Sequence, residues 1–575
     1  MAFGGGNDGG NGKKKKVAIM GASALILVAM VVAVAVGVHK GGSDDDDHSS
    51  SGSISTSSKA VKQICAPTDY RETCETSLSS VNSTDPKELI KAGFQVAVQH
   101  LRVAIENSTT LKELAKDPRA NQALSNCEEL MDYAIDDIQD SFNRLGAFDI
   151  SKLEEYVEDL KVWLGGAVTY EQTCLDGFEN TTGDAGDRMK AILKTAQELT
   201  SNGLAMVTEI YNVLNSNLNL PNAPSTPNPP HRRLLNEEET PSWVNDGKRK
   251  LLAASPADLK PDVVVAKDGS GKYKTVNEAL KDIPKYGNNT FVIYIKAGVY
   301  EETVIIDKTM THVMMIGDGP TKSVITGSKN YVDGTLTFKT ATVTIIGGNF
   351  TAKDMGFENS AGPEKHQAVA LRVQSDLSLF YNCRMDGYQD TLYTHAHRQF
   401  YRDCTITGTI DFIFGDAGAV FQNCQMIVRK PLDNQNCIVT AQGRSDRRTP
   451  SAIILQNCTI SGDPLYMPVK DVNKAYLGRP WKEFSRTIIM QSQIDDIIQP
   501  DGWLPWAGTF AINSCFYTEF NNRGAGADMS KRVKWKGIKT ITPQHAVDFT
   551  PGRFLGGDRW IKATGIPYVS GMINV

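Results

Sequence analysis

A short theme recurs through the middle of the chain and limits the folds that the chain can adopt. Each copy joins an aromatic or apolar residue to Asn or Asp and then to Cys. The four cysteines are spaced by 21, 20 and 34 residues, at Cys383, Cys404, Cys424 and Cys458. Repeats of roughly 20 to 25 residues with β-type segments indicate a solenoid, because one coil can bury its apolar face only against the next. The sequence therefore predicts an all-β parallel β-helix.

Two aspartates in this region stand among aromatic and apolar residues rather than in a charged surface segment. Asp390 and Asp411 are 21 residues apart, which is one coil, so we expect them side by side at about 4.8 Å. A buried carboxylate needs a partner, because removing its charge from water is unfavourable. Arg479 could hold one carboxylate ionised, while the other keeps a raised pKa and carries a proton.

Two amides follow the same spacing. Gln367 lies 22 residues before Gln389, so we expect two amides and two carboxylates on one patch of wall. The chain has no Gly-x-Ser-x-Gly segment, and its histidines stand in no catalytic motif. His395 and His397 lack a third metal-type ligand nearby, so zinc is not expected. We therefore assign the chemistry to carboxylates, with no metal and no cofactor.

Five blocks, in order, resemble the signature segments of plant pectin methylesterases. They are Gly298–Glu302, Gln367–Ala370, Gly387–Tyr393, Asp411–Gly415 and Leu477–Trp481. The resemblance runs from about Lys260 to Val575, and we place the domain at 253–575. It implies a right-handed parallel β-helix and a carboxylic ester hydrolase. Such an enzyme removes methyl groups from methylesterified homogalacturonan, giving methanol and free galacturonate carboxylates, in cell wall modification.

The resemblance also implies a role for each motif residue. Asp411 matches the nucleophile and Asp390 the acid/base. Gln367 and Gln389 match the amides that hydrogen-bond the oxyanion, and Arg479 matches the cation that orients Asp411.

Further residues are expected to contact the substrate, together with Gln367 and Arg479. They are Thr337, Tyr393, Trp481 and Trp503, although the Thr337 alignment could slip to Thr335. Trp503 and Trp506 are either walls of the cleft or packing residues of the cap.

The first 40 residues predict a membrane-insertion segment. A lysine cluster precedes Val17–Val38, a stretch of 22 uncharged residues, which is long enough to span a bilayer. We favour an uncleaved anchor, although Ala33-Val34-Ala35 leaves signal cleavage open. The precursor would contact the membrane only through this segment, and the acidic, Ser-rich stretch 41–60 reads as a flexible stalk.

Everything after the segment is expected to enter the secretory pathway. Six Asn-x-Ser/Thr sequons predict glycosylation, at Asn82, Asn107, Asn180, Asn288, Asn349 and Asn457, and Asn457 is the one expected to be too buried for modification.

Helical periodicity dominates residues 61–218 and favours an antiparallel four-helix bundle. Four cysteines there allow three pairings. The segment resembles plant pectin methylesterase inhibitor and invertase inhibitor domains, and this resemblance implies the bonds Cys65–Cys74 and Cys127–Cys174. In the β-helix we favour a disulfide between Cys404 and Cys424, one coil apart.

A Pro- and Asn-rich linker, 219–252, joins the two parts. It carries two basic pairs before paired leucines, Arg232-Arg233 and Arg249-Lys250, which resemble the sites cut by a processing protease in precursors of this family. We count 36 Lys and Arg against 31 Asp and Glu from Ala253 onward, and 25 against 35 before it. A basic module released from an acidic one suits a polyanionic substrate.

Three readings follow. The first is a cell-wall enzyme made as a precursor, with separate pectin methylesterase inhibitor proteins as further partners. The second is an inhibitory or binding protein that acts through the bundle, with an inactive β-helix. The third is another pectin-active β-helix enzyme, a lyase or glycosidase. Nucleic acid is excluded as a partner, because no nucleic-acid-binding fold is recognised in a secretory chain.

Overall fold

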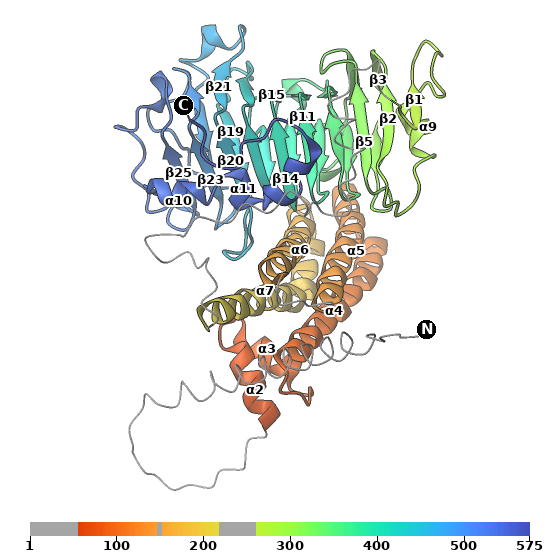
Figure 1. The fold of residues 1–575 in the computed structure, drawn as a ribbon, viewed down its shortest axis with the longest axis vertical. Helices are drawn as coiled ribbons and strands as arrows, with labels where there is room; N and C mark the ends of the chain where they lie inside the picture. The colour runs from red at the N-terminus through yellow and green to blue at the C-terminus, as the bar shows by residue number, and fades with distance from the viewer. Residues whose placement is uncertain (1–55, 147–151, 218–259, 575) are drawn as a thin grey trace, which may run out of the picture.

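The computed structural model describes residues 56–146, 152–217 and 260–574 (Figure 1). The membrane-insertion segment and all four residues of the basic pairs lie outside these ranges. Within the described residues, no helix combines the length and apolar character that a membrane crossing requires.

The C-terminal part is a parallel β-helix built from three sheets, as predicted. Sheet A contains ten strands: β1 Val263–Val265, β2 Phe291–Ile295, β5 Val313–Gly317, β8 Thr351–Lys353, β11 Ser378–Tyr381, β14 Arg398–Arg402, β17 Gly418–Gln422, β20 Ala452–Gln456, β23 Arg486–Met490 and β25 Phe516–Phe520. Sheet B contains eight: β3 Gly298–Glu301, β6 Ser323–Gly327, β9 Gly356–Asn359, β12 Arg384–Asp386, β15 Thr405–Gly408, β18 Gln425–Val428, β21 Thr459–Gly462 and β24 Gln493–Ile494. Sheet C contains seven: β4 Val304–Ile306, β7 Val343–Ile345, β10 Leu371–Val373, β13 Leu392–Thr394, β16 Ile413–Gly415, β19 Cys437–Gln442 and β22 Ala475–Gly478.

The repeated Asn or Asp turns the chain from sheet A into sheet B. At each coil this residue has a positive φ, between 50° and 57°, as at Asp354, Asn382, Asp403, Asn423 and Asn457. Asn and Asp adopt this left-handed conformation more readily than other residues with side chains. The recurring theme therefore marks the corner of each coil.

The cysteines after these corners stack in the interior as free thiols, so the predicted Cys404–Cys424 disulfide is wrong. Strands β15 and β18 pair in register directly after them. In-register side chains run parallel, about 4.8 Å apart, whereas a disulfide brings the two Cβ atoms to about 3.8 Å. Each thiol instead points to backbone carbonyls, and Cys404 Sγ lies 3.3 Å from the Arg402 oxygen.

The N-terminal part is a bundle of four long helices with a short helical hairpin. The helices are α2 Thr56–Cys65, α3 Arg71–Leu78, α4 Pro86–Leu114, α5 Pro118–Gly146, α6 Leu153–Asp176 and α7 Ala185–Asn217. Helix α2 begins inside the range expected for the stalk. Both disulfides implied for this domain are confirmed, Cys65–Cys74 between α2 and α3 and Cys127–Cys174 between α5 and α6.

Short helices complete the β-helix. Helix α9, Val276–Leu280, packs at its N-terminal end, and α10 Pro543–Val547 and α11 Pro551–Phe554 cover sheet A. The bundle stands against the β-helix, with α5 and α6 reaching it (Figure 1). One apolar cluster joins the bundle core to Phe338, Tyr393 and Phe414 of the β-helix. The bundle therefore covers sheet C.

The sequons remain predictions. The side chains of Asn82, Asn180 and Asn288 are exposed. Asn457 is half-buried, and its amide donates to Asn423 in the neighbouring coil, which agrees with the expectation that it escapes glycosylation.

Candidate active site

The two aspartates lie side by side at the entrance to sheet C. Strands β13 and β16 pair with Leu392 opposite Ile413, so the residues two positions earlier, Asp390 and Asp411, occupy matching places on adjacent coils. Both have positive φ, 65° and 50°. Such conformations are uncommon in residues other than glycine and cluster at functional sites.

Arg479 holds Asp411 through two parallel hydrogen bonds. Its Nε donates to Oδ1 at 2.8 Å, and its Nη2 donates to Oδ2 at 2.5 Å. The guanidinium also lies 4.3 Å from the Trp506 ring centre. This bidentate geometry fixes the plane of the carboxylate, and Arg479 therefore orients Asp411 as expected.

The environment separates the two carboxyl groups. Burial and the charge of Asp411 raise the pKa of Asp390 well above its ordinary value. Burial also raises the pKa of Asp411, but the charge and hydrogen bonds of Arg479 oppose this rise. Two close carboxylates do not ionise together readily. Asp390 is therefore the group that carries the proton, and Asp411 is the ionised one.

Both glutamines line the same cavity of about 250 Å³ as the two aspartates and Arg479. Neither side-chain amide has a hydrogen-bond partner within the described residues. Amide donors next to a carboxylate can bind an oxygen that becomes negative during a reaction. The cavity thus brings together all five residues that the sequence predicted.

Most of the predicted substrate contacts also face this cavity. Thr337, Tyr393 and Trp481 line it, and Thr335 does not. The prediction that Trp503 contacts the substrate is wrong. Its side chain is 1% exposed, its ring packs on Tyr517, and its indole N–H donates to Glu519.

Sequence reasoning missed several lining residues. Phe414 lies opposite Tyr393 in the next coil, with the two rings stacked at 4.2 Å, and the coil spacing from Tyr393 would have identified it. Trp506, which the sequence left open as a cleft wall or a packing residue of the cap, lines the cavity, whereas Trp503 does not. Tyr331 and Phe338 also line it, and no motif marks them.

The bundle contributes part of the cavity wall. Asn126 from α5 and Thr173 and Asp176 from α6 line the space above the aspartates, followed by Gly177, Glu179 and Asn180. Thr173 Oγ1 lies 2.9 Å from His395 Nε2, and Thr169 Oγ1 donates to Asp416 at 2.8 Å. No local sequence signal predicts these contacts.

A carboxylate pair, two free amides and a paired arginine on a parallel β-helix define the class of this protein, a β-helical carboxylic ester hydrolase. The pectinesterase family model matches residues 262–558, and the plant invertase/pectin methylesterase inhibitor model matches residues 59–206. The chain therefore belongs to the pectinesterase family, with an inhibitor-family domain at its N-terminal side.

Relatives from plants share both parts. A protein named probable pectinesterase/pectinesterase inhibitor 21 of Arabidopsis thaliana is 54% identical over 524 residues, covering 90% of this chain and 77% of its own. Pectinesterase 2 of Arabidopsis thaliana is 44% identical, covering 89% and 90%.

Among solved structures, pectin methylesterase from carrot is 50% identical with a TM-score of 0.54. It covers 55% of this chain and 99% of its own. The carrot chain therefore has no counterpart of the bundle, so a β-helix of this family keeps its fold in a chain that lacks one.

The paired arginine leads to a test by pH. Because Arg479 lowers the pKa of Asp411, Arg479→Gln should raise that pKa and leave the nucleophile protonated over more of the acidic range. We expect the acidic limb of the kcat/KM profile to move to higher pH, with Arg479→Lys between the variant and the wild type. An acidic limb that stays in place in Arg479→Gln would contradict the assignment.

Proposed function

We propose that the chain hydrolyses the methyl esters of homogalacturonan, releasing methanol and free galacturonate carboxylates, with Asp411 as nucleophile. The observation that carries the proposal is the bidentate Arg479–Asp411 pair beside a carboxyl group that keeps its proton. The free amides of Gln367 and Gln389 face the same space.

The first half-reaction breaks the ester bond. An Asp411 oxygen attacks the carbonyl carbon, and the carbonyl oxygen takes up the negative charge. The Gln367 and Gln389 amides donate hydrogen bonds to that oxygen. As the intermediate collapses, Asp390 gives its proton to the departing methoxy oxygen. Methanol leaves, and the galacturonate acyl group remains joined to Asp411 as an anhydride.

The second half-reaction restores the enzyme. Asp390, now ionised, takes a proton from a water molecule that attacks the anhydride. The product leaves as a carboxylic acid that gives its proton to the solvent and becomes galacturonate, Asp411 regains its carboxylate, and Asp390 is again protonated. Aromatic side chains flank this position, and Tyr393, Trp481 and Trp506 offer flat faces to sugar rings. The mechanism needs one proton donor and one anion. This matches the two aspartates, because the pKa of Asp390 is raised well above its ordinary value, whereas Arg479 opposes the rise in the pKa of Asp411.

We propose that the bundle keeps the full chain latent until the linker is cut at Arg232-Arg233 or Arg249-Lys250. Helix α6 approaches sheet C closely because it carries Gly165 and Gly166. A Cβ atom on Gly166 would meet both members of the interdomain pair Asp137–His397, within 2.5 Å of Asp137 Oδ2 and of His397 Nε2. One on Gly165 would lie 2.8 Å from a Thr449 methyl group. A polymer could not lie along sheet C while α6 occupies it.

The same proposal assigns locations to the two forms. The precursor travels through the secretory pathway, anchored by Val17–Val38 if this segment stays uncleaved. The proposed domains are 1–40, 41–60, 61–218, 219–252 and 253–575, except that α2 moves the start of the bundle from 61 to Thr56 or earlier. The processed β-helix acts in the cell wall. A purely inhibitory protein is less favoured, because all five residues of the site are present and assembled.

The oxyanion role is tested by removing one amide. Gln389→Ala should lower kcat for methanol release by ~10² to 10³, with a smaller change in KM, because the donor acts mainly on the transition state. The same range applies to Gln367→Ala. Turnover within about twofold of wild type would remove that glutamine from the role.

Latency is tested in an unprocessed chain with Arg232, Arg233, Arg249 and Lys250 replaced. Adding Gly166→Ala should raise methanol release about tenfold or more, because overpacking at the contact with His397 costs ~1–3 kcal/mol. Gly93→Ala is the matched control, since it is also a helix glycine but a Cβ there meets nothing within 4 Å.

Equal activity in the Gly166→Ala chain and in the unprocessed chain without this substitution would contradict the proposal that the docked bundle keeps the enzyme inactive. So would an equal gain in the Gly93→Ala control.

A further inference from the structure

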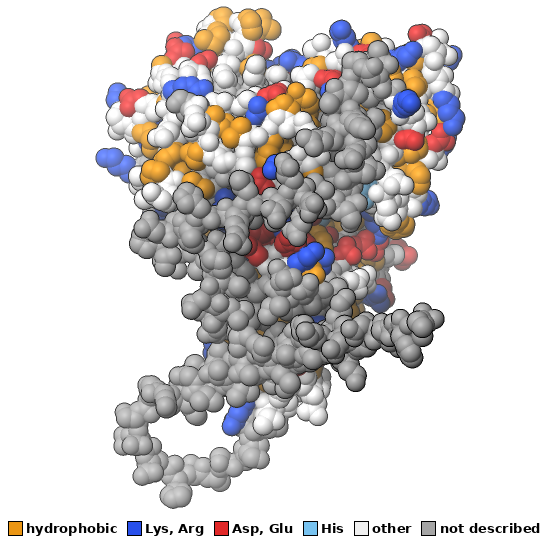
Figure 2. Space-filling model, in the orientation of Figure 1, with side chains coloured by type: hydrophobic (Ala, Val, Ile, Leu, Met, Phe, Trp, Pro, Cys, Tyr) orange, Lys and Arg blue, Asp and Glu red, His pale blue; other side chains and the backbone are white. Residues whose placement is uncertain are grey.

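The ion pairs between the two domains all run in one direction. Among the described residues, every such pair joins an acid of the bundle to a base of the β-helix. The acids are Asp69, Glu129, Asp132, Asp136, Asp137, Glu155, Glu158, Asp159 and Asp176; the bases, which we call the basic face, are Lys308, Lys339, His397, Arg398, Arg447, Arg448, Lys482 and Arg559. Figure 2 shows acidic side chains gathered where the bundle meets the β-helix.

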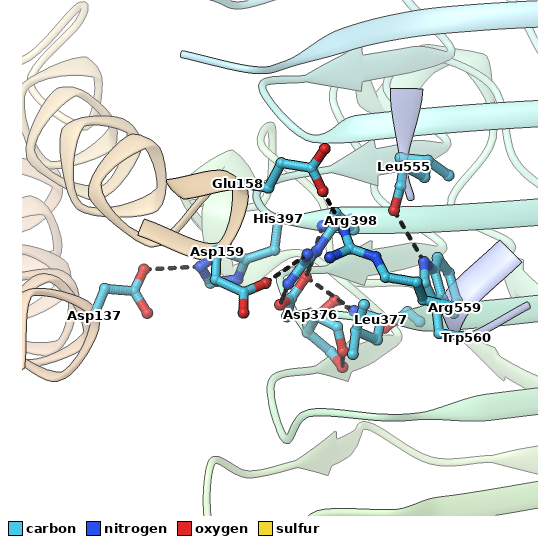
Figure 3. Close-up of polar contacts among 12 residues, drawn as sticks. Asp137, Glu158, Asp159, Asp376, Leu377, His397, Arg398, Leu555, Arg559 and Trp560 are labelled. Carbon is cyan, nitrogen blue, oxygen red and sulfur yellow. Dashed lines mark hydrogen bonds and ion pairs between the residues drawn. The ribbon is translucent and has the colours of Figure 1, made fainter. Parts of the chain in front are cut away.

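The central contacts are close and buried (Figure 3). Arg398 lies between Asp376 of its own domain, at 2.5 Å, and Asp159 of the bundle, at 2.9 Å. His397 Nε2 lies 2.8 Å from Asp137 Oδ2. Burial opposes the charge on His397, but Asp137 outweighs it and the pKa of His397 rises to about 9. The bundle thus places carboxylates directly on cations of the enzyme.

The basic face adjoins the catalytic cavity. Lys482 follows Trp481, which lines the cavity, and its partner Asp176 lines the cavity as well. Lys339 belongs to the same short segment as the lining residues Thr337 and Phe338. A polymer that leaves the cavity therefore meets these cations next.

One buried cation makes no ion pair among the described residues, although the charge of Glu129 acts on it. Arg372 is 2% exposed, and its Nε and Nη1 have no hydrogen-bond partner in the described part of the chain. It lies in register beside Tyr393, with its guanidinium 3.6 Å from the Phe338 ring centre. Buried donors without an acceptor are destabilising, so these two N–H groups beside the cavity point to a ligand that is absent while the bundle is docked.

We propose that the basic face, together with Arg372, binds unesterified stretches of homogalacturonan, and that the bundle acids occupy this site in place of galacturonate carboxylates. The proposal rests on the proposed function, because that reaction produces these carboxylates. The substrate site would then extend beyond the cavity to the surface of the β-helix that the bundle covers. This shared surface also makes the product a competitor of the bundle, so polymer that is already de-esterified displaces the bundle from the enzyme.

The direct test is binding of polygalacturonate to the β-helix alone, residues 253–575, at one fixed salt concentration. Arg447→Gln with Arg448→Gln should weaken binding about tenfold, because the domain loses two cations that would pair with galacturonate carboxylates. Lys534→Gln with Lys536→Gln is the matched control: it removes the same charge from exposed lysines outside the bundle contact and should change binding less than about twofold.

Equal weakening in the two double variants would overturn the proposal, because net charge alone would then explain binding. Unchanged binding in both would overturn it too. Lys308→Gln with Lys482→Gln repeats the measurement at two other bundle contacts, in case the arginine variant does not fold. Methanol release by the wild-type domain, measured on methylesterified polymer, reports separately on the proposed function.

A variant of Arg372 tests the proposal a second time, because binding and melting temperature together distinguish a ligand-binding role from a structural one. Arg372→Met should weaken polygalacturonate binding while leaving the melting temperature of the full chain unchanged or higher, because the substitution removes two buried N–H donors that have no acceptor. A lower melting temperature with unchanged binding would show that Arg372 serves only the fold.

Competition is tested in the unprocessed full chain by amide hydrogen exchange. Polygalacturonate should increase exchange in α5 and α6, whereas dextran, a polysaccharide without carboxylates, should not. No increase at a concentration that saturates the β-helix alone would contradict displacement. An equal increase with polyglutamate would contradict a galacturonate site, because it would show that the basic face attracts polyanions in general.

Discussion

In-register stacking of parallel coils is the constraint on which this structure depends. It sets the distance between equivalent residues, so an acid repeated after one coil lies beside its predecessor. Asp390 and Asp411 meet in this way at matching positions before β13 and β16. Their proximity in turn separates their proton affinities, because burial disfavours two charges and Arg479 supports only one of them. The stacking of the coils therefore determines both the fold and the different protonation of the two aspartates.

The same stacking explains why the site is covered so effectively. Outward-facing residues of successive coils form a flat surface on sheet C, and a helix with two glycines can lie close against it. The bundle supplies acids where the β-helix supplies bases, and its apolar core continues into Phe338, Tyr393 and Phe414. Inhibition and substrate recognition can therefore use one surface, with carboxylates as the common chemical group.

Much of the β-helix and of its active site could be predicted from sequence, because the decisive signals are local or repeat with the coil. Asn and Asp at the corners indicate a left-handed turn, and the interval from Asp390 to Asp411 indicates that the two residues are neighbours. Spacing alone did not separate a ladder of thiols from a disulfide, since both place Cys404 beside Cys424. The role of Trp503 depended on Glu519 and Tyr517, which are distant in sequence. Docking joins residues such as Asp137 and His397, 260 positions apart, and no local pattern reports such a contact.

The central claim is that Asp411 forms a covalent bond with the acyl group. Hydrolysis of methyl and ethyl esters of homogalacturonan in the presence of hydroxylamine tests it directly, because an acyl group bound to Asp411 has already lost its alcohol when water or hydroxylamine attacks it. The account predicts the same ratio of galacturonate to galacturonyl hydroxamate from both esters. A ratio that differs between the two esters would contradict the covalent route and would make Asp411 a base for direct attack by water.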